Sequence, residues 1–111
     1  MVRKIMLMKL TDQGIKDIKN APKQIEEAIA TFKDMGGKML CFYAVTGEYD
    51  YLAIGEAPNE EIVMAFVMGL GAQGNVRTTT SNAFTTKELA TMVDKCYSCF
   101  QEVLDMRPGA V

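Results

Sequence analysis

The chain has 111 residues, of which 49% are hydrophobic and 23% charged, with a formal net charge of −2 and no histidine. This length fits one domain with an adequate core, and this composition excludes a disordered chain. The lack of histidine excludes Ser-His-Asp triads, Cys-His dyads and HExxH-type zinc sites, because each needs an imidazole.

Strand-like and helix-like blocks alternate along the first third of the chain. Residues 3–10 are an apolar run that we expect to form a strand, and Thr11 then caps a short helical turn. A helix follows, because apolar residues recur at i, i+3, i+4 and i+7 from Ile25. Gly36–Gly37 supply its left-handed end.

The middle of the chain predicts a β-hairpin and then a buried helix. Residues 38–46 and 51–56 are two apolar strands joined by the polar turn Gly47–Asp50. Asn59 is a good N-cap for the next helix, which is apolar on nearly every side from Ile62 to Leu70. One face of this helix must meet the sheet, and the other must meet a neighbouring helix or a second subunit.

The last two elements are a polar strand and a long amphipathic helix. Residues 75–84 have no apolar face, so we expect an edge strand or the wall of a pocket. Thr85–Glu88 are a capping box that opens a helix of residues 86–106, which Pro108–Gly109 end. The apolar stripe of this helix consists of Leu89, Met92, Val93, Cys96, Phe100, Val103 and Leu104.

The order of these elements predicts an α+β fold, a ferredoxin-like βαββαβ domain with an added C-terminal helix. Residues 1–111 would form a single domain with its core at about 3–95 and the helix at about 86–106. Both helices of the βαββαβ unit should cover one face of the sheet. If the C-terminal helix does not cover the other face, a second sheet from another subunit should. We therefore expect a homodimer or a higher homo-oligomer.

Four motif blocks stand in order along the chain: Leu7–Gly14, Gly47–Asp50, Glu56–Pro58 and Gly74–Thr78. Together they resemble the GYD-domain family of small bacterial and archaeal proteins, over roughly residues 5–95. The resemblance implies a dimeric α+β barrel, a fold shared with cofactor-free monooxygenases, small isomerases and ligand-sensing domains. It implies no particular reaction, because one fold serves many activities.

The resemblance carries the family signature onto Gly47, Tyr49 and Asp50 in the hairpin and onto Gly74, Asn75, Val76 and Arg77 before and in the last strand. In the structural interpretation, Gly47 adopts a positive φ, Asp50 bonds backbone amides within the turn and Tyr49 packs over the sheet. Glu48, Gly74 and Asn75 are then parts of the turns.

The functional interpretation makes the same residues a binding site. Tyr49 and Asp50 would point into a cavity beneath the sheet, with Asp50 as base or acceptor and Tyr49 as phenolic donor. Arg77 would bind an anionic group, helped by the hydroxyl of Thr79 or Thr80. A third interpretation gives Arg77 an ion pair with Asp50 or Glu48.

Several partners are excluded by the distribution of charge and hydropathy. The basic residues are scattered, so no stripe follows a phosphate backbone, and we expect no nucleic acid. The first apolar run has only four residues before Lys9, which is too short for a signal peptide or a membrane span. We expect no membrane partner.

The cysteines Cys41, Cys96 and Cys99 indicate free thiols in a reducing cytoplasm. Cys96 and Cys99 have CxxC spacing, but they lie inside a predicted helix and lack the further ligands of a structural zinc site. We therefore expect no metal and no cofactor. Core packing is the expected role of these thiols, with an oxidation-sensitive pair as the alternative.

Three classes of function remain. The first is a small-ligand-binding or regulatory homo-oligomer, which the lack of histidine favours over catalysis. The second is a cofactor-independent enzyme, oxygenase- or isomerase-like, that acts on a small molecule through Tyr49, Asp50 and Arg77. The third is a structural or partner-binding protein that uses the apolar helix at residues 62–70.

Overall fold

A computed structural model of the chain describes residues 1–105, except for the side chain of Leu104. The predicted helix end at residue 106 and the stop at Pro108–Gly109 lie outside the described residues. The elements are β1 (Val2–Leu10), α1 (Asp12–Lys16), a 3₁₀ turn η1 (Ile18–Asn20), α2 (Ala21–Asp34), β2 (Lys38–Ala44), β3 (Tyr51–Ala57), α3 (Glu60–Gln73), β4 (Val76–Asn82) and α4 (Thr86–Asp105).

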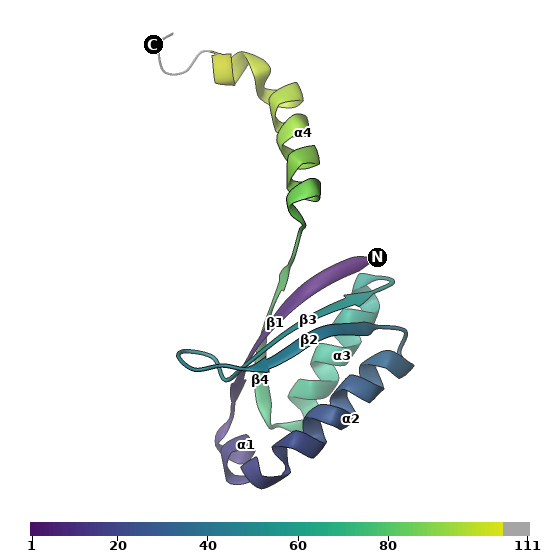
Figure 1. Cartoon of the computed structure of the whole chain (residues 1–111), viewed down its shortest axis with the longest axis vertical. Helices are drawn as coiled ribbons and strands as arrows, with labels where there is room; N and C mark the ends of the chain where they lie inside the picture. Colours follow the sequence, from purple (N-terminus) through teal and green to yellow (C-terminus); the bar gives the residue numbers. More distant parts are fainter. Residues whose placement is uncertain (106–111) are drawn as a thin grey trace.

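The four strands form one antiparallel sheet in the order β2-β3-β1-β4. Helices α2 and α3 lie together on one face of this sheet (Figure 1). This arrangement confirms the predicted ferredoxin-like fold and places β4 at an edge, where a strand with no apolar face is tolerated. None of the described helices combines the length and the apolar character that crossing a membrane requires.

The core lies between the sheet and helices α2 and α3. Alternate residues of β1, among them Met6 and Met8, point toward the helices because side chains alternate across a strand. Helix α2 contributes Phe32 and helix α3 contributes Val63 and Phe66. The ring centroids of Phe32 and Phe66 are 4.6 Å apart, so the two helices meet at this aromatic pair.

The predicted helix caps are confirmed. The Asn59 carboxamide oxygen accepts the Ile62 backbone N–H at 3.1 Å at the start of α3. Before α4, the Thr85 hydroxyl accepts the Glu88 N–H at 3.1 Å and the Glu88 carboxylate accepts the Thr85 N–H at 2.8 Å, which is the reciprocal capping box. Local sequence therefore sets the first residue of both α3 and α4.

Helix α4 leaves the sheet and extends away from it (Figure 1). Every residue from Phe84 to Val103 is exposed, so the stripe of α4 packs on nothing within the described chain. The expectation that Cys96 and Cys99 pack in a core is therefore wrong for this chain alone. The physical reason is that α4 runs on past the end of the sheet instead of folding back over its uncovered face.

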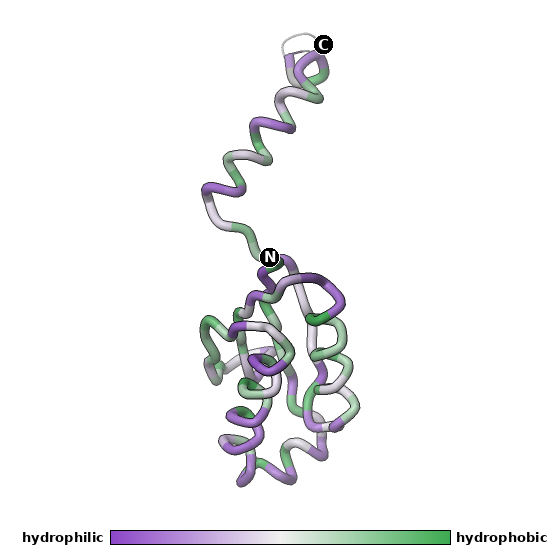
Figure 2. The backbone as a smooth tube through the Cα atoms, turned by 90° about the vertical axis from the view of Figure 1, so that its right-hand side faces the viewer, coloured by the Kyte–Doolittle hydropathy of each residue, from purple (hydrophilic) through white to green (hydrophobic). Residues whose placement is uncertain are grey.

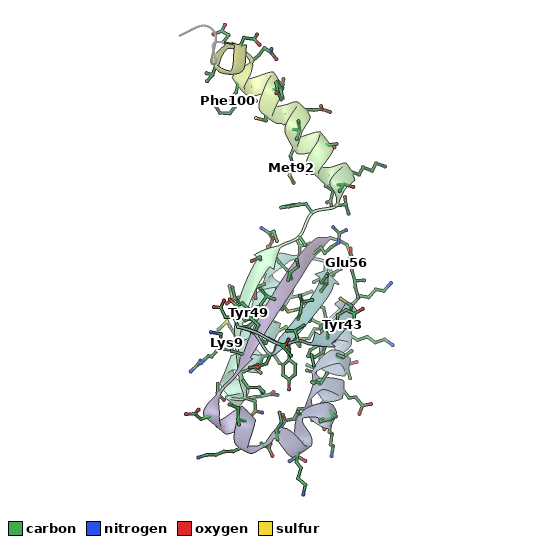
Figure 3. The ribbon with its side chains drawn as sticks, turned by 60° about the vertical axis from the view of Figure 1, so that its left-hand side comes forward. Lys9, Tyr43, Tyr49, Glu56, Met92 and Phe100 are labelled. Atoms are coloured by element: carbon green, nitrogen blue, oxygen red, sulfur yellow. The ribbon has the colours of Figure 1, made fainter. Side chains whose placement is uncertain are left out.

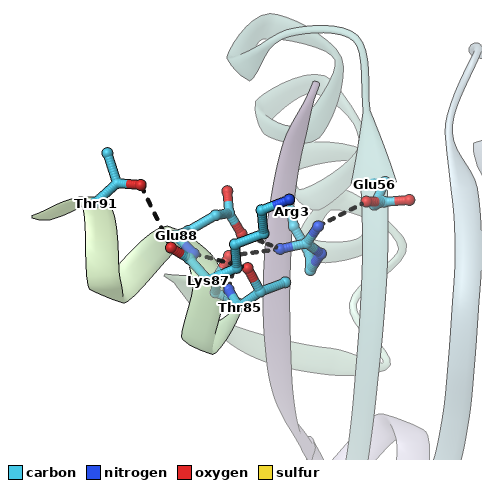
Figure 4. Close-up of polar contacts among 7 residues, drawn as sticks. Arg3, Glu56, Thr85, Lys87, Glu88 and Thr91 are labelled. Atoms are coloured by element: carbon cyan, nitrogen blue, oxygen red, sulfur yellow. Dashed lines mark hydrogen bonds and ion pairs between the residues drawn. The ribbon is translucent and has the colours of Figure 1, made fainter.

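One ion-pair cluster holds the first turn of α4 against its own sheet (Figure 4). The Arg3 guanidinium donates to Glu88 at 2.8 Å and to Glu56 at 3.2 Å. The Thr85 backbone N–H, the Arg3 guanidinium and the Thr85 hydroxyl together lower the pKa of Glu88 to about 2. Glu88 is therefore a carboxylate at neutral pH, and through Arg3 it links the first turn of α4 to β1 and β3.

Candidate functional site

Three of the four motif blocks meet at the C-terminal end of β1. The hairpin turn between β2 and β3 projects on the side of the sheet away from the helices (Figure 1). The turn Thr11–Gly14 follows β1 directly, and Gly74–Asn75 lead into β4, which pairs with β1 from Val76 onward. Residues far apart in the sequence are thus gathered around one strand end.

Asp50 joins the hairpin to β1. Its carboxylate accepts the Leu10 backbone N–H at 2.8 Å, and its own N–H donates to the Met8 carbonyl at 2.9 Å. Its carbonyl accepts the Val45 N–H at 2.9 Å across the turn. The structural interpretation placed these side-chain bonds within the turn, but the carboxylate instead satisfies an amide of the neighbouring strand.

Lys9 contacts two further residues of the turn, Glu48 and Tyr49 (Figure 3). Its ammonium nitrogen lies 5.6 Å from the centroid of the Tyr49 ring and 3.7 Å from the Glu48 carboxylate. Such a cation–π contact is electrostatically favourable, and it keeps Tyr49 on the face of the sheet away from the helices. Gly47 has φ +111°, which confirms the predicted positive φ in this turn.

The turn after β1 is locked to the chain between α3 and β4. The Thr11 N–H donates to the Asn75 carbonyl at 3.0 Å, and the Gln13 carboxamide donates to the Asn75 side chain at 3.0 Å. Gly74 ends α3 with φ +83°. Gly14 is packed so closely that a Cβ there would lie 2.2 Å from the Asn75 carbonyl oxygen.

Arg77 lies on the same face as Lys9, because the two are cross-strand partners in β1 and β4. Arg77 is exposed and forms no ion pair with any described residue. The ion pair with Asp50 or Glu48 that we considered is therefore not formed. Thr79 shares this face, whereas Thr80 points to the opposite face, where it lines a groove with Lys4 and Met64.

A small cavity of about 50 Å³ does lie beneath the sheet, between it and the two helices. It is lined by apolar core residues and by the side chains of Tyr51, Gln24, Gln73 and Asn75. Burial, and then the Asp50 charge, raise the pKa of Tyr51, so its phenol is neutral at pH 7. Tyr49, Asp50 and Arg77 do not line this cavity, in contrast to their expected position in the functional interpretation.

Two residues of this structure escaped the sequence interpretation. Tyr51 begins β3 and faces the cavity, although only its neighbours Tyr49 and Asp50 were singled out. Lys4 is 8% exposed on the helix side of β1, where it pairs with Glu60 at 2.7 Å and bonds to the Asn82 side chain. The sequence signal was the spacing of two residues, because Lys4 lies on the same face of the strand as Met6 and Met8.

We call the end of β1 where the three motif blocks meet (Leu7–Gly14, Gly47–Asp50 and Gly74–Thr78) the signature end. The side chains there are suited to binding. The Asp50 carboxylate oxygen Oδ2 accepts the Leu10 backbone N–H, and no hydrogen bond joins this carboxylate to another side chain among residues 1–105. The groups on the uncovered face are the Arg77 guanidinium, the Tyr49 phenol and the Thr79 hydroxyl, which suit recognition of an anionic or polar group. Among residues 1–105, no group of three or more Cys, Asp or Glu side chains is placed to hold a metal ion.

Comparison with known proteins gives three findings. A family model described as the GYD domain matches residues 5–93. A protein of Thermus thermophilus named "Glutamine synthetase and cystathionine beta-lyase binding protein" is 31% identical over 86 residues, which are 77% of this chain and 90% of that protein. The crystal structure of an FFRP protein matches with a TM-score of 0.55 at 20% identity, over 76% of this chain and 100% of that one, and shows the fold alone.

Proposed function

Because this chain belongs to the GYD-domain family, we propose that it is a regulatory binding protein, a cytoplasmic homo-oligomer that docks onto a metabolic enzyme. The relative that is named as binding glutamine synthetase and cystathionine beta-lyase supports this class of partner, since the match spans 90% of that relative. The arrangement at the signature end, with its bonded Asp50, supports binding over catalysis.

The observation that carries the proposal is the outer face of α3. After its first turn, helix α3 has no charged residue. Figure 2 shows this part of the chain almost free of hydrophilic colour. Met64 and Met68 are 60% and 65% exposed, and the small residues Ala65, Gly69 and Ala72 lie beside them. An exposed apolar face of this kind marks a protein interface, and methionine adapts to a partner's shape.

The direct test is binding to glutamine synthetase and to cystathionine β-lyase from the same cells, measured by surface plasmon resonance. We expect at least one of the two enzymes to bind. Met64→Glu should then raise the Kd at least about tenfold, because it buries an unpaired carboxylate in an apolar contact. The homo-oligomer should stay intact in this variant.

The matched control is Ile18→Glu, which places the same charge on another exposed apolar residue, 50% exposed in η1. This control should bind as tightly as the unchanged protein. If neither enzyme binds at micromolar concentration, the proposed class of partner is wrong. If both glutamate variants lose binding equally, α3 is not the docking face.

A second candidate function is the binding of a small anionic ligand, favoured by the Arg77 guanidinium, which forms no ion pair among residues 1–105 and lies on the same face of β4 as Thr79. Asp50 supports this site from the adjoining turn, and Thr80 lies on the far side of β4. Native mass spectrometry of protein purified from its own cells should then show an adduct that Arg77→Ala removes. Thr80→Ala should retain it. An empty spectrum for the unchanged protein would count against the ligand.

The uncovered face of the sheet supports the homo-oligomer. Its centre is apolar, with Ile5 and Leu7 on β1 and Leu52 and Ile54 on β3, and none of the described helices covers it. An antiparallel sheet with an apolar second face is stabilised when another layer packs on it. A second copy of the chain can supply that layer.

A further inference from the structure

Besides the outer face of α3, two apolar surfaces of this chain lack a partner within residues 1–105. The first is the open face, which we define as the side of the sheet away from α2 and α3, with Ile5, Leu7, Cys41, Tyr43, Leu52 and Ile54 at its centre. The second is the stripe of α4, whose described members are Leu89, Met92, Val93, Cys96, Phe100 and Val103. An isolated helix with an exposed apolar stripe is marginal in water, so α4 needs a surface to pack on.

The first turn of α4 already contacts the open face through one acidic residue. Arg3 is an open-face residue of β1, and Glu88 in the first turn of α4 already pairs with it at 2.8 Å. From this point α4 continues beyond the end of its own sheet (Figure 3). The stripe of α4 therefore does not contact the open face of its own chain, and it is accessible to another molecule.

The charges around the two surfaces are opposite. The open face has four cations, Arg3, Lys9, Lys38 and Arg77, against two carboxylates, those of Glu56 and of Glu48 in the hairpin turn. Helix α4 has four carboxylates, Glu88, Asp94, Glu102 and Asp105, against Lys87 and Lys95. Contact between an acidic helix and a cationic face is favourable, whereas two open faces packed together would bring like charges into one layer.

The dimensions also allow this contact. Helix α4 is kinked at Phe100 (φ −117°, ψ 16°), so its straight segment, residues 86–99, is about 21 Å long at about 1.5 Å per residue. A strand of 9 residues, the length of β1, spans about 30 Å at about 3.3 Å per residue. The straight segment of one α4 can therefore lie along about two thirds of β1.

We propose that α4 is an exchanged arm: its apolar stripe packs on the open face of a second copy, whose own α4 packs on the first copy in return. The inference rests on the homo-oligomer of the proposed function and names the contact that forms it. The exchange covers the open face and the stripe at once. Direct pairing of two α4 helices would leave the open face bare, and their seam would have only two heptads, which is short for a coiled coil.

The first test is the dimer dissociation constant of the full chain, measured by analytical ultracentrifugation. Val93→Asp and Phe100→Asp each place a carboxylate in the stripe, and each should raise this constant at least about 100-fold. Ser98→Asp is the matched control, because residue 98 lies on the opposite side of α4, and it should leave the constant unchanged.

The two proposals fail separately in this experiment. If the unchanged protein is a monomer at micromolar concentration, the homo-oligomer and the exchanged arm are both wrong. If it is a dimer whose dissociation constant the two stripe variants leave unchanged, the exchanged arm alone is wrong. The homo-oligomer then stands.

The second test uses the native thiols, since Cys41 lies on the open face and Cys96 and Cys99 lie on α4. A short bismaleimide should join two chains into a covalent dimer, which Cys41→Ser and the double variant Cys96→Ser, Cys99→Ser should each abolish. A dimer that survives Cys41→Ser would show that two α4 helices pair with each other. A linked dimer that survives the double variant would show that the open faces of two sheets pack on each other. Either of these results, or no linked dimer at all, overturns the inference.

Discussion

Replacing Phe32 by alanine should lower the free energy of unfolding by about 3–5 kcal/mol. Phe32 is 1% exposed and packs on the Phe66 ring at a centroid distance of 4.6 Å. Two glycines make room for its ring, since a Cβ at Gly37 would lie 2.6 Å from it and one at Gly55 would lie 2.9 Å from it. Alanine would leave a cavity that these backbone segments cannot fill. Chemical denaturation followed by circular dichroism measures the loss.

Phe84→Ala is the matched control for this prediction. Phe84 is 57% exposed between β4 and α4, so the same truncation removes little buried surface. We expect a change within about 0.5 kcal/mol, as for ordinary surface substitutions. Equal losses in the two variants would contradict the assignment of Phe32 to the centre of the core.

Gly14→Ala should destabilise the protein by about 1–3 kcal/mol, although alanine is normally the better residue in a helix. Its Cβ would lie 2.2 Å from the Asn75 carbonyl oxygen, which also accepts the Thr11 N–H. Because that contact is with backbone, the turn after β1 must move away from the start of β4. A thermal melt should show the loss, and the signature end should become less protected in amide hydrogen exchange.

Gly69→Ala is the control, because Gly69 is also helical but a Cβ there has nothing within 4 Å. In this variant we expect the free energy of unfolding to rise by about 0.5–1 kcal/mol, because alanine has the higher helix propensity. Stability changes of opposite sign in the two alanine variants would show that glycine is required at residue 14 for its close approach to the Asn75 carbonyl. A gain in both would mean that the contact with Asn75 relaxes without cost.

Much of the fold was predictable because it follows from local patterns. The apolar periodicity of α2 and the Asn59 and Thr85 caps depend on neighbours within a few residues, and each is observed as predicted. The order of the elements, with right-handed crossovers, then leaves few possible arrangements for the sheet. The motif blocks were visible in the sequence, and the structure brings three of the four together at the end of β1.

The roles of the signature residues were harder to predict, because they depend on partners far away in the sequence. Asp50 bonds to Leu10, a residue 40 positions earlier, and Lys9 rather than Arg77 pairs with Glu48. Thr79 and Thr80 are neighbours in sequence but lie on opposite faces of β4. Strand register decides each of these contacts, and register is a property of the assembled sheet.

The sequence by itself determined the α+β class, the caps and the amphipathic character of α4, because these depend on local propensity and period. Only the tertiary structure decided where α4 goes and that the Cys96 and Cys99 thiols are exposed. The same stripe of Leu89, Val93 and Phe100 satisfies a helix packed on its own sheet or on another chain. A hydrophobic pattern specifies that a face must be covered, but it does not specify which surface covers it.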